Sequence, residues 1–322
     1  MGVHESDTIR TVRFHEYGEP ADVLRMDWAP VPDPGPGRIR VSVHACGLNP
    51  ADWALCRGLF PGELPRGIGL DVSGTVTAVG ADVADAAVGD LVLGRADYAG
   101  VPVAGASDQA IMDHWTSVPE GLDLVQAAAL PMAVETAYRS VDSLGVSAGQ
   151  TLLVHGAGTM IGFAAVQIAL LRGARVVATT GDTYAARLHA LGAAVTSYGE
   201  GIAGRVTEAV GGPADLVLDT APPSGVLPDL IKTADGDPRR VLTVTDFPAA
   251  AELGARDSFH EGSPLRWDVL GEFAQLAADG QFTIPVARTF ALEDWRTALE
   301  ISQSGHAHGK LILLPRAAGG AG

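Results

Sequence analysis

The sequence predicts an α/β protein made of a β-rich, barrel-like domain and a doubly wound parallel sheet. Two observations support this fold class. Short runs of β-branched residues, separated by Gly and Pro, fill the early part of the chain. From residue 151 onward, short apolar runs alternate with helical stretches, which is the pattern of βαβ units. The chain has 322 residues, of which 47% are hydrophobic and 19% charged, so it can build a substantial core.

The β-rich part begins with two expected strands, at residues 8–15 and 38–45, separated by a Pro/Gly-rich turn. A turn leading into a short helix follows at 46–53. Strand patterns recur at 71–79 and 88–93, each bounded by turn residues. This spacing of short strands and turns is typical of a small barrel.

The stretch 151–180 carries the clearest pattern in the chain. A short run with three apolar residues at its centre, Thr151–His155, predicts a strand buried on both faces. A helical pattern from Phe163 to Leu171 and a second strand from Arg175 to Thr179 follow it. A glycine-rich loop joins the first strand to the helix, and such loops bring backbone N–H groups to a pyrophosphate. The residues that this βαβ unit would offer to a dinucleotide are Gly156, Ala157, Gly158, Thr159, Met160, Ile161 and Gly162.

The glycine spacing departs from the common G-x-G-x-x-G pattern. Gly156 and Gly158 fit it, but Ile161 stands at the third glycine position and Gly162 comes one residue later. A tight turn without a nucleotide therefore remains an alternative for the loop taken alone. The flanking strands and helix favour the nucleotide interpretation.

The remaining expected elements continue the alternation of helices and strands. In chain order they are a helical region at 125–144 broken at Pro131, then helix 184–191, strand 194–198, helix 202–210, strands 216–219 and 241–244, helices 267–278 and 290–302, and strand 311–314.

Charge and cysteine content restrict the partners and the compartment. The formal net charge of −16 argues against nucleic acid or an anionic membrane as a partner. No apolar run approaches the length of a membrane span, and the first residues lack the apolar core of a secretion signal. Cys46 and Cys56 are the only cysteines, which predicts no disulfide framework. We therefore expect a cytoplasmic protein.

Six segments together resemble the medium-chain dehydrogenase/reductase superfamily, in particular its zinc-independent quinone oxidoreductase branch. They are GLNPADW at 47–53, GLDVSGTV at 69–76, VGD at 88–90, AAALPMAVETAY at 127–138, GQTLLVHGAG at 149–158 and HGKLILLP at 308–315. The resemblance implies a GroES-like catalytic domain from both chain ends, expected at 1–128 and 265–322, and a Rossmann NADP(H)-binding domain at 129–264. It also implies a homodimer, formed near residues 241–258.

The resemblance also implies that no metal is bound. Zinc-dependent relatives place Cys and His where this chain has Asn49 and Leu70, and no Cys follows Cys56. His44, Cys46 and Cys56 lack a fourth ligand at the usual spacing. The alternative is that the two cysteines are small buried hydrophobic residues.

NADPH is the cofactor that the resemblance implies, with NADH as the less favoured option. The second strand of the βαβ unit ends at Thr180 without the acidic residue that usually binds the ribose of NAD. Asp182 lies close and keeps NADH open. The resemblance places Tyr184, where the family often has Lys, and Tyr198 near the 2′-phosphate, with Arg187 as the nearest cation. A surface tyrosine and a charge on a helix face are the alternatives for Tyr184 and Arg187.

The resemblance further implies hydride transfer to an apolar quinone or an α,β-unsaturated ketone or aldehyde. It places Asn49 near the nicotinamide as a hydrogen-bond donor to substrate and Thr136 near the carboxamide, and we also assign Val244 to the cofactor site. We expect Asp52 to orient the turn, although a turn residue and a helix N-cap are the alternatives for Asn49 and Asp52. A tyrosine that many relatives carry is Ala54 here. Candidate apolar walls of the substrate pocket, each of which could instead be core, are Trp53, Phe60, Met132 and Phe247.

Two rival functions remain open from the sequence. A non-catalytic NADPH-binding protein of the same fold would tolerate the altered loop and the missing tyrosine. A serine hydrolase is suggested by the G-x-S-x-G match at 145–149, but a nucleophile elbow needs a strand before it and a helix after it. Here the predicted order is reversed.

Overall fold

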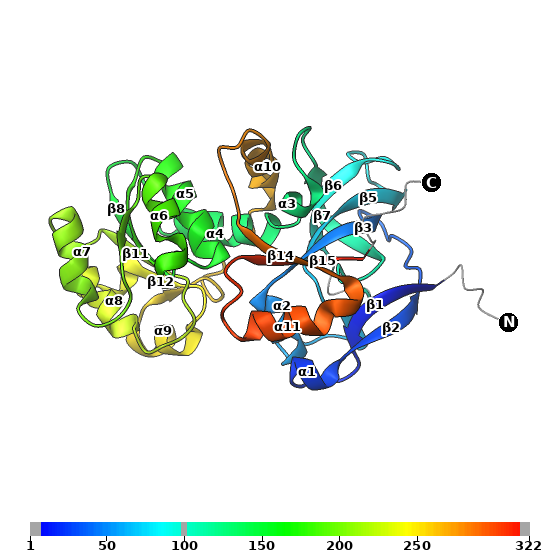
Figure 1. The fold of residues 1–322 in the computed structure, drawn as a ribbon, viewed down its shortest axis with the longest axis horizontal. Helices are drawn as coiled ribbons and strands as arrows, with labels where there is room; N and C mark the ends of the chain where they lie inside the picture. Colours follow the sequence, from blue (N-terminus) through cyan, green and yellow to red (C-terminus); the bar gives the residue numbers. More distant parts are fainter. Residues whose placement is uncertain (1–7, 98–101, 316–322) are drawn as a thin grey trace. The chain divides into compact units, whose positions relative to one another are not determined.

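The computed structural model describes residues 8–97 and 102–315 and divides the chain into two compact units. Unit 1 comprises Met1–Met132 and Trp267–Gly322, and unit 2 comprises Ala133–Arg266. Unit 1 therefore takes both ends of the chain, coloured blue and red in Figure 1, whereas unit 2 is one continuous segment. No helix in the described part of the chain is long and apolar enough to cross a bilayer.

Unit 1 is built mainly from strands. They are β1 (Thr8–Phe14), β2 (Leu24–Pro30), β3 (Ile39–Leu48), β4 (Arg66–Gly67), β5 (Asp71–Val79), β6 (Leu91–Ala96), β7 (Gln109–Ser117), β14 (Val286–Ala291) and β15 (Lys310–Leu314). Its helices are α1 (Pro20–Val23), α2 (Pro50–Cys56), α3 (Leu124–Ala127), α10 (Leu270–Ala278) and α11 (Trp295–Gln303), with 3-10 turns η3 (Trp267–Val269) and η4 (Leu292–Asp294).

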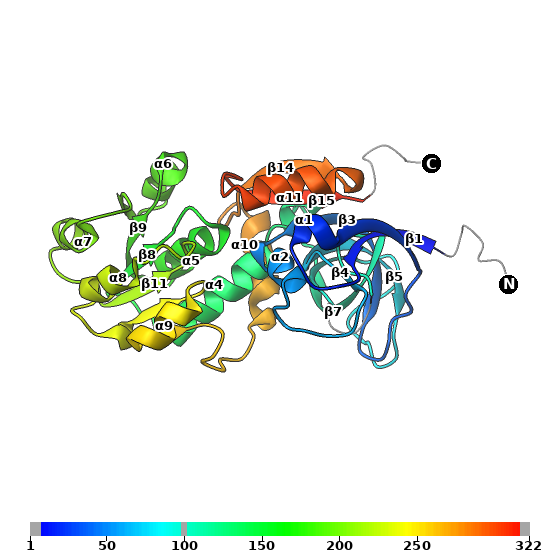
Figure 2. The same ribbon diagram turned by 90° about the horizontal axis from the view of Figure 1, so that it is seen from below.

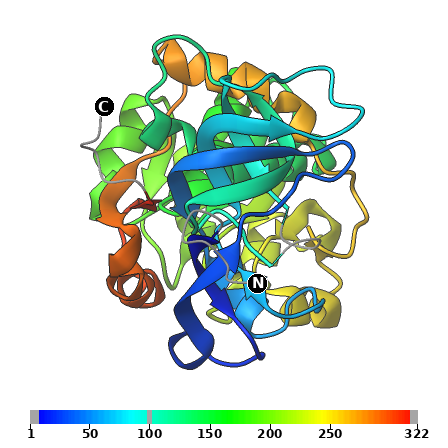
Figure 3. The same cartoon turned by 90° about the vertical axis from the view of Figure 1, so that its right-hand side faces the viewer.

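The larger sheet of unit 1 closes on itself. Its strand order is β14-β15-β3-β5-β6-β7, and an additional pairing of β3 with β7 completes a four-stranded barrel. Figure 3 shows these strands curling around one another. A smaller sheet, β2-β1-β4, lies beside the barrel. In Figure 2 the C-terminal strand β15 runs beside the N-terminal part of the unit, because it pairs antiparallel with β3.

Unit 2 is a six-stranded parallel sheet with helices along it. Its strands are β8 (Thr151–His155), β9 (Arg175–Thr179), β10 (Ala194–Thr196), β11 (Leu216–Asp219), β12 (Val241–Thr243) and β13 (Arg256–Asp257). Its helices are α5 (Met160–Leu171), α6 (Asp182–Ala190), α7 (Ile202–Val210), α8 (Leu227–Thr233) and α9 (Phe247–Leu253), with η2 (Pro238–Arg240), while α4 (Pro131–Ser143) begins in unit 1 and continues into unit 2.

The strand order in unit 2 is β10-β9-β8-β11-β12-β13. The chain therefore moves outward from β8 through β9 to β10 and then returns to the other side of β8 at β11. In a sheet of this kind, ligands bind at the carboxyl ends of the two strands where the direction reverses. The glycine-rich loop follows β8 at this point, so the predicted doubly wound sheet is confirmed together with the position of its loop.

Three sequence-based expectations for unit 1 were wrong. Residues 46–48 were expected in a turn but complete β3. The segment between the first two expected strands contains α1 and β2, which were not predicted. Phe290 was expected to begin a helix but lies in β14, and α11 begins only at Trp295, after η4. The acidic pair Glu293 and Asp294 marks the start of helical structure but says nothing about the residues before it.

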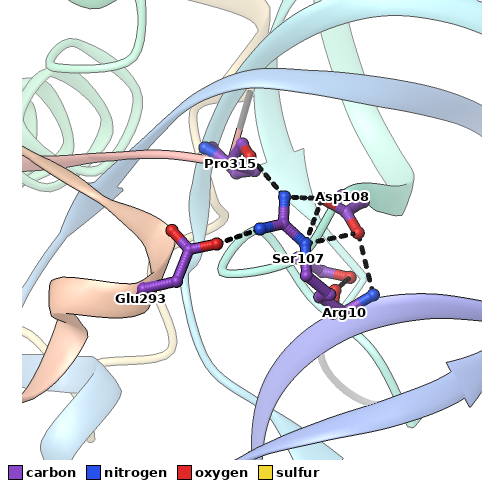
Figure 4. Close-up of polar contacts among 5 residues, drawn as sticks. All are labelled: Arg10, Ser107, Asp108, Glu293 and Pro315. Atoms are coloured by element: carbon purple, nitrogen blue, oxygen red, sulfur yellow. Dashed lines mark hydrogen bonds and ion pairs between the residues drawn. The ribbon is translucent and has the colours of Figure 1, made fainter. Parts of the chain in front are cut away.

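Arg10 on β1 connects four segments of unit 1 (Figure 4). Its guanidinium donates to Asp108, with the Nη2–Oδ1 distance at 2.6 Å, and to the carbonyl oxygen of Pro315 at 2.6 Å. It also donates to Glu293 in η4. Because the guanidinium is planar and carries five N–H donors, it can serve these acceptors at the same time. Both ends of the chain are thereby tied to the middle of the unit.

We predict that Arg10→Ala lowers the free energy of unfolding by about 1–3 kcal/mol, since it removes several charge-assisted hydrogen bonds from a half-buried position. Urea denaturation measures the change. Arg57→Ala is the matched control, because Arg57 pairs with Glu19 at 2.7 Å on an exposed surface and should cost less than about 1 kcal/mol. Equal losses in the two variants would contradict the role given to Arg10.

Candidate functional site

The loop between β8 and α5 is confined by two glycines. Gly156 has a φ of +83°, and a Cβ there would lie 2.5 Å from the backbone nitrogen of Ala221. A Cβ on Gly162, in the first turn of α5, would lie 2.3 Å from the Gly156 carbonyl oxygen. Within residues 8–97 and 102–315, the backbone N–H groups of Met160 and Ile161, at the start of α5, donate no hydrogen bond. These are the groups that a helix N-terminus offers to an anion.

Thr159 is the N-cap of α5, and its side chain is held inside the loop. Its Oγ1 accepts the Gly162 N–H at 3.0 Å and donates to Oγ1 of Thr220, just past β11, at 3.0 Å. The Ala157 N–H donates to the carbonyl oxygen of Thr179 at the end of β9, at 2.9 Å. The loop is therefore bonded to both neighbouring strands, and the hydroxyl at position 159 stabilises the helix start.

Four of the predicted cofactor residues lie together at this loop. A Cβ on Gly158 would lie 3.1 Å from Thr180 Oγ1, 3.6 Å from the ring of Tyr184 and 3.9 Å from the hydroxyl of Tyr198. These side chains come from the end of β9, from α6 and from the segment after β10. Tyr184 is only 7% exposed and packs on Phe163 at 5.4 Å between ring centroids, so the alternative of a surface tyrosine is wrong.

The other predicted cofactor residues lie elsewhere in unit 2. Arg187, also on α6, places its guanidinium 5.1 Å from the ring centroid of Phe163. Val244 follows directly after β12. Thr136 is a buried residue of α4, and its hydroxyl donates to Glu135 at 3.3 Å.

A second cluster of predicted and unpredicted polar groups lies in unit 1. Asn49 is the N-cap of α2, and its side chain contacts Asp71 on β5 and Lys310 on β15. Lys310 Nζ donates to Asp71 Oδ2 at 2.5 Å and to Asn49 Oδ1 at 2.6 Å, while Asn49 Nδ2 donates to Asp71 Oδ2 at 3.0 Å. The Met132 N–H donates to Asp71 Oδ1 at 2.9 Å. The ion pair is almost completely buried.

Asp52 supports the same cluster from inside α2. It is the third residue of the helix and not its N-cap, which corrects the alternative given for it above. One carboxyl oxygen accepts the N–H of Asn49 at 2.7 Å, and the other accepts those of Gly69 at 2.7 Å and Leu70 at 3.1 Å. Burial raises the pKa of Asp52 to about 7, against the opposing effect of these N–H groups. The carboxyl therefore fixes the start of α2 against the segment before β5.

The four candidate pocket residues are divided between the two units, three in unit 1 and one in unit 2. Trp53 is 3% exposed and belongs to the core of unit 1. Met132 packs against the same core. Phe60 is 42% exposed, with a φ of 56°. Phe247 lies in unit 2, where its ring stacks on Phe259 at 5.6 Å.

The side chains that the sequence offers as metal ligands are His44, Cys46 and Cys56. Among the residues that the structure describes, no three His, Cys, Asp or Glu side chains group as a metal site requires. Burial raises the pKa of the Cys56 thiol to about 12 and also raises the pKa of the Cys46 thiol, as expected for small buried side chains. His44 shares a hydrogen bond with Thr75 at 3.0 Å.

Sequence reasoning missed Asp71 and Lys310. Both lie within segments that carry the family resemblance, GLDVSGTV and HGKLILLP. The signal that could have identified them is a charged residue at the first position of a strand. It does not identify the partner, because the two residues are 239 positions apart.

Fold and site together define a two-domain nucleotide-binding oxidoreductase architecture, and comparisons with known proteins specify it. The profile "Alcohol dehydrogenase GroES-like domain" matches residues 35–119, and "Zinc-binding dehydrogenase" matches residues 191–313. The solved quinone oxidoreductase from Coxiella burnetii superposes with a TM-score of 0.80 at 27% identity, covering 96% of this chain and 100% of that one.

Two curated relatives extend the comparison. The human quinone oxidoreductase is 37% identical over 179 residues, 54% of this chain and 53% of the relative. Erythronolide synthase EryA2 of Saccharopolyspora erythraea is 33% identical over 293 residues, 86% of this chain but 8% of that protein. The aligned regions thus span about half of the first relative and a small part of the second.

The chain belongs to the medium-chain dehydrogenase/reductase superfamily, on its quinone oxidoreductase-like branch. This superfamily consists of nicotinamide-dependent oxidoreductases. The predicted GroES-like and Rossmann architecture is confirmed.

We predict that Gly162→Ala lowers the free energy of unfolding by about 1–3 kcal/mol, because the new methyl group meets backbone atoms that cannot move away. Thermal or urea unfolding measures the change. Gly204→Ala in α7 is the control, since a Cβ there meets nothing within 4 Å and should stabilise the helix by roughly 0.5–1 kcal/mol. A destabilised Gly204→Ala variant would show that the loss of stability does not depend on the space available to the new methyl group.

Asp52 also predicts a pH dependence of stability. Because its pKa is raised in the folded protein from the usual 3.8 to about 7, folding favours the protonated carboxyl. The stability it contributes is complete below about pH 4 and is lost as pH rises towards about 7. The advantage of the wild type over Asp52→Asn should therefore shrink across this window, by about 4 kcal/mol at most. Urea unfolding of both proteins between pH 4 and 8 measures it, and parallel curves would contradict the shift.

Proposed function

We propose that the protein is an NADPH-dependent, zinc-independent oxidoreductase that transfers hydride to a quinone or to the β-carbon of an α,β-unsaturated ketone or aldehyde. The observation that carries the proposal is the loop after β8, where the free N–H groups at the start of α5 lie beside a group of hydroxyls. Similarity to quinone oxidoreductases supports the reaction class.

The loop and its surroundings fit a dinucleotide phosphate. The N–H groups of Met160 and Ile161 would bind the pyrophosphate. The hydroxyls of Thr180 and Tyr198 and the ring of Tyr184 lie around Gly158. The two hydroxyls are compatible with a 2′-phosphate and do not repel it as a carboxylate would. Bound NADPH would supply the hydride.

The residues of unit 1 would stabilise charge on the substrate. As hydride reaches the β-carbon, negative charge develops on the carbonyl oxygen, and an N–H donor lowers the barrier. Asn49 Nδ2 is the donor that we propose. Asp52 would hold the start of α2, and thus Asn49, in place. The proton that completes the reduction would come from water, because Ala54 occupies the position of the tyrosine in many relatives.

Zinc chemistry does not fit these residues. Zinc-dependent relatives use side chains at the positions of Asn49 and Leu70, and neither residue supplies a thiolate or an imidazole here. The Asn49 amide oxygen already accepts from Lys310. Charge stabilisation by hydrogen bonding is therefore the mechanism that we propose.

The proposal predicts tighter binding of NADPH than of NADH, and oxidation of NADPH when a quinone or an enone is added. Fluorescence titration measures the first property, and absorbance at the nicotinamide band measures the second. Thr180→Asp places a carboxylate beside Gly158 and should weaken NADPH binding at least tenfold while affecting NADH less.

Equal or tighter NADH binding would contradict the cofactor assignment. Tight NADPH binding without turnover across a panel of quinones, enones and enals would favour the alternative, a non-catalytic NADPH-binding protein of the same fold. Ser147→Ala serves as a control. Among the residues that the structure describes, Ser147 bonds to Gln150 within its own turn, so its loss should not affect either measurement.

A further inference from the structure

The chain contains only two lysines, Lys232 and Lys310, although it carries 22 lysine and arginine residues in total. Lys232 is a surface residue with 69% of its side chain exposed, paired with Asp229 at 2.7 Å. Lys310 is the opposite case, with 2% of its side chain exposed. A buried ammonium in a chain that otherwise uses arginine calls for a specific reason.

The structure makes room for this particular side chain. A Cβ on Gly47 of β3 would lie 2.8 Å from Lys310 Cε and 2.3 Å from the carbonyl oxygen of Ala128. Glycine at position 47 therefore lets the lysine stem pass over β3. The backbone is fixed as well, since the Lys310 N–H donates to the Pro285 carbonyl oxygen at 2.7 Å. The ammonium thus reaches Asn49 from a rigid position.

Lys310 and Asp71 determine which way the Asn49 amide points. An amide has an acceptor end and a donor end of nearly equal shape, so its orientation is set by its partners. Lys310 can only donate, and it contacts Oδ1 at 2.6 Å. Ionised Asp71 can only accept, and it contacts Nδ2 at 3.0 Å. The opposite orientation would place donor against donor and acceptor against acceptor.

This orientation leaves one N–H of Asn49 weakly used. One hydrogen of Nδ2 goes to Asp71, and the nearest other acceptor is the Gly47 carbonyl oxygen at 3.4 Å, which is long for a hydrogen bond. A substrate oxygen could therefore take this second hydrogen without breaking a strong contact. In the flipped amide, the same direction would present the carbonyl oxygen, which repels a developing oxyanion.

We propose that Lys310 and Asp71 are positioning residues that hold the Asn49 amide with its N–H2 group available to the substrate oxygen. The inference rests on the proposed function for its catalytic part, while the orientation itself is a property of the protein alone. The other charged group bonded at this place is Asp52, which accepts the Asn49 backbone N–H and leaves the side-chain amide to Lys310 and Asp71.

Nuclear magnetic resonance tests the orientation without cofactor or substrate. In protein labelled with ¹⁵N-lysine, the ammonium of Lys310, buried between two acceptors, should exchange slowly with water and give an Nζ–H signal. Exposed Lys232 should give none. Lys232→Met should keep the signal, Lys310→Met should abolish it, and Asn49→Ala should shift it because one acceptor is lost. An unchanged signal in Asn49→Ala, or no slowly exchanging signal, would overturn the contact.

Turnover tests the positioning role. Asn49→Ala should lower kcat/KM for the acceptor at least tenfold with the NADPH dissociation constant unchanged within twofold. The double variant Lys310→Met/Asp71→Asn removes both charges together, so it avoids a lone buried ion. It should be folded and lose as much kcat/KM as Asn49→Ala. The triple variant Lys310→Met/Asp71→Asn/Asn49→Ala should lose no more kcat/KM than Asn49→Ala or the double variant. All of these changes remove the same interaction with the substrate oxygen.

A folded double variant with wild-type kcat/KM would overturn the positioning role, and so would a triple variant in which the losses multiply. If the double variant does not fold, Lys310→Met/Asp71→Leu, which also removes both charges, replaces it in the same comparison with the wild type. Wild-type protein without turnover would refute the proposed function alone, because the lysine signal still decides the orientation of Asn49.

Discussion

The buried contact between Lys310 and Asp71 holds together segments of unit 1 that lie far apart in the sequence. Removing two ions from water costs several kcal/mol for each, and only close pairing with further hydrogen bonds offsets that cost. Here the pairing distance is 2.5 Å, and Asn49 and the Met132 N–H complete the contacts of the carboxylate. The pair connects β15 to β5 and to the first residue before α2. The same contact therefore joins distant segments of unit 1 and positions Asn49, the polar group that we place in the reaction.

Local patterns predicted unit 2 well. The strand at Thr151–His155 was predicted with its observed bounds, because a run buried on both faces is uniformly apolar and ends at glycine. The loop position followed from the same segment. The helix after it begins at Met160, three residues before the predicted start at Phe163, because Thr159 is its N-cap. Hydrophobic periodicity does not show a helix start whose first turn contains a glycine.

Unit 1 was predicted less well because its structure depends on pairings between distant segments. β14 exists because it pairs with β15, and its exposed residues carry no apolar alternation that would identify a strand. The cluster around Asn49 shows the same limit for the site. The motif containing Asn49 was visible in the sequence, whereas its partners at positions 71 and 310 were visible only as charged residues in apolar surroundings. Sequence patterns relate residues that are a few positions apart. They could not predict this cluster, because only the fold brings its residues together.

The Arg10 network has a consequence for the order of folding during synthesis. Unit 2 is a continuous segment, so a ribosome finishes it while the last strands of unit 1 are still untranslated. Arg10 precedes unit 2 in the sequence, whereas two of its acceptors, Glu293 and the Pro315 carbonyl oxygen, follow it. Until β15 has been synthesised, the edge of β3 that pairs with it therefore lacks this partner in the nascent chain.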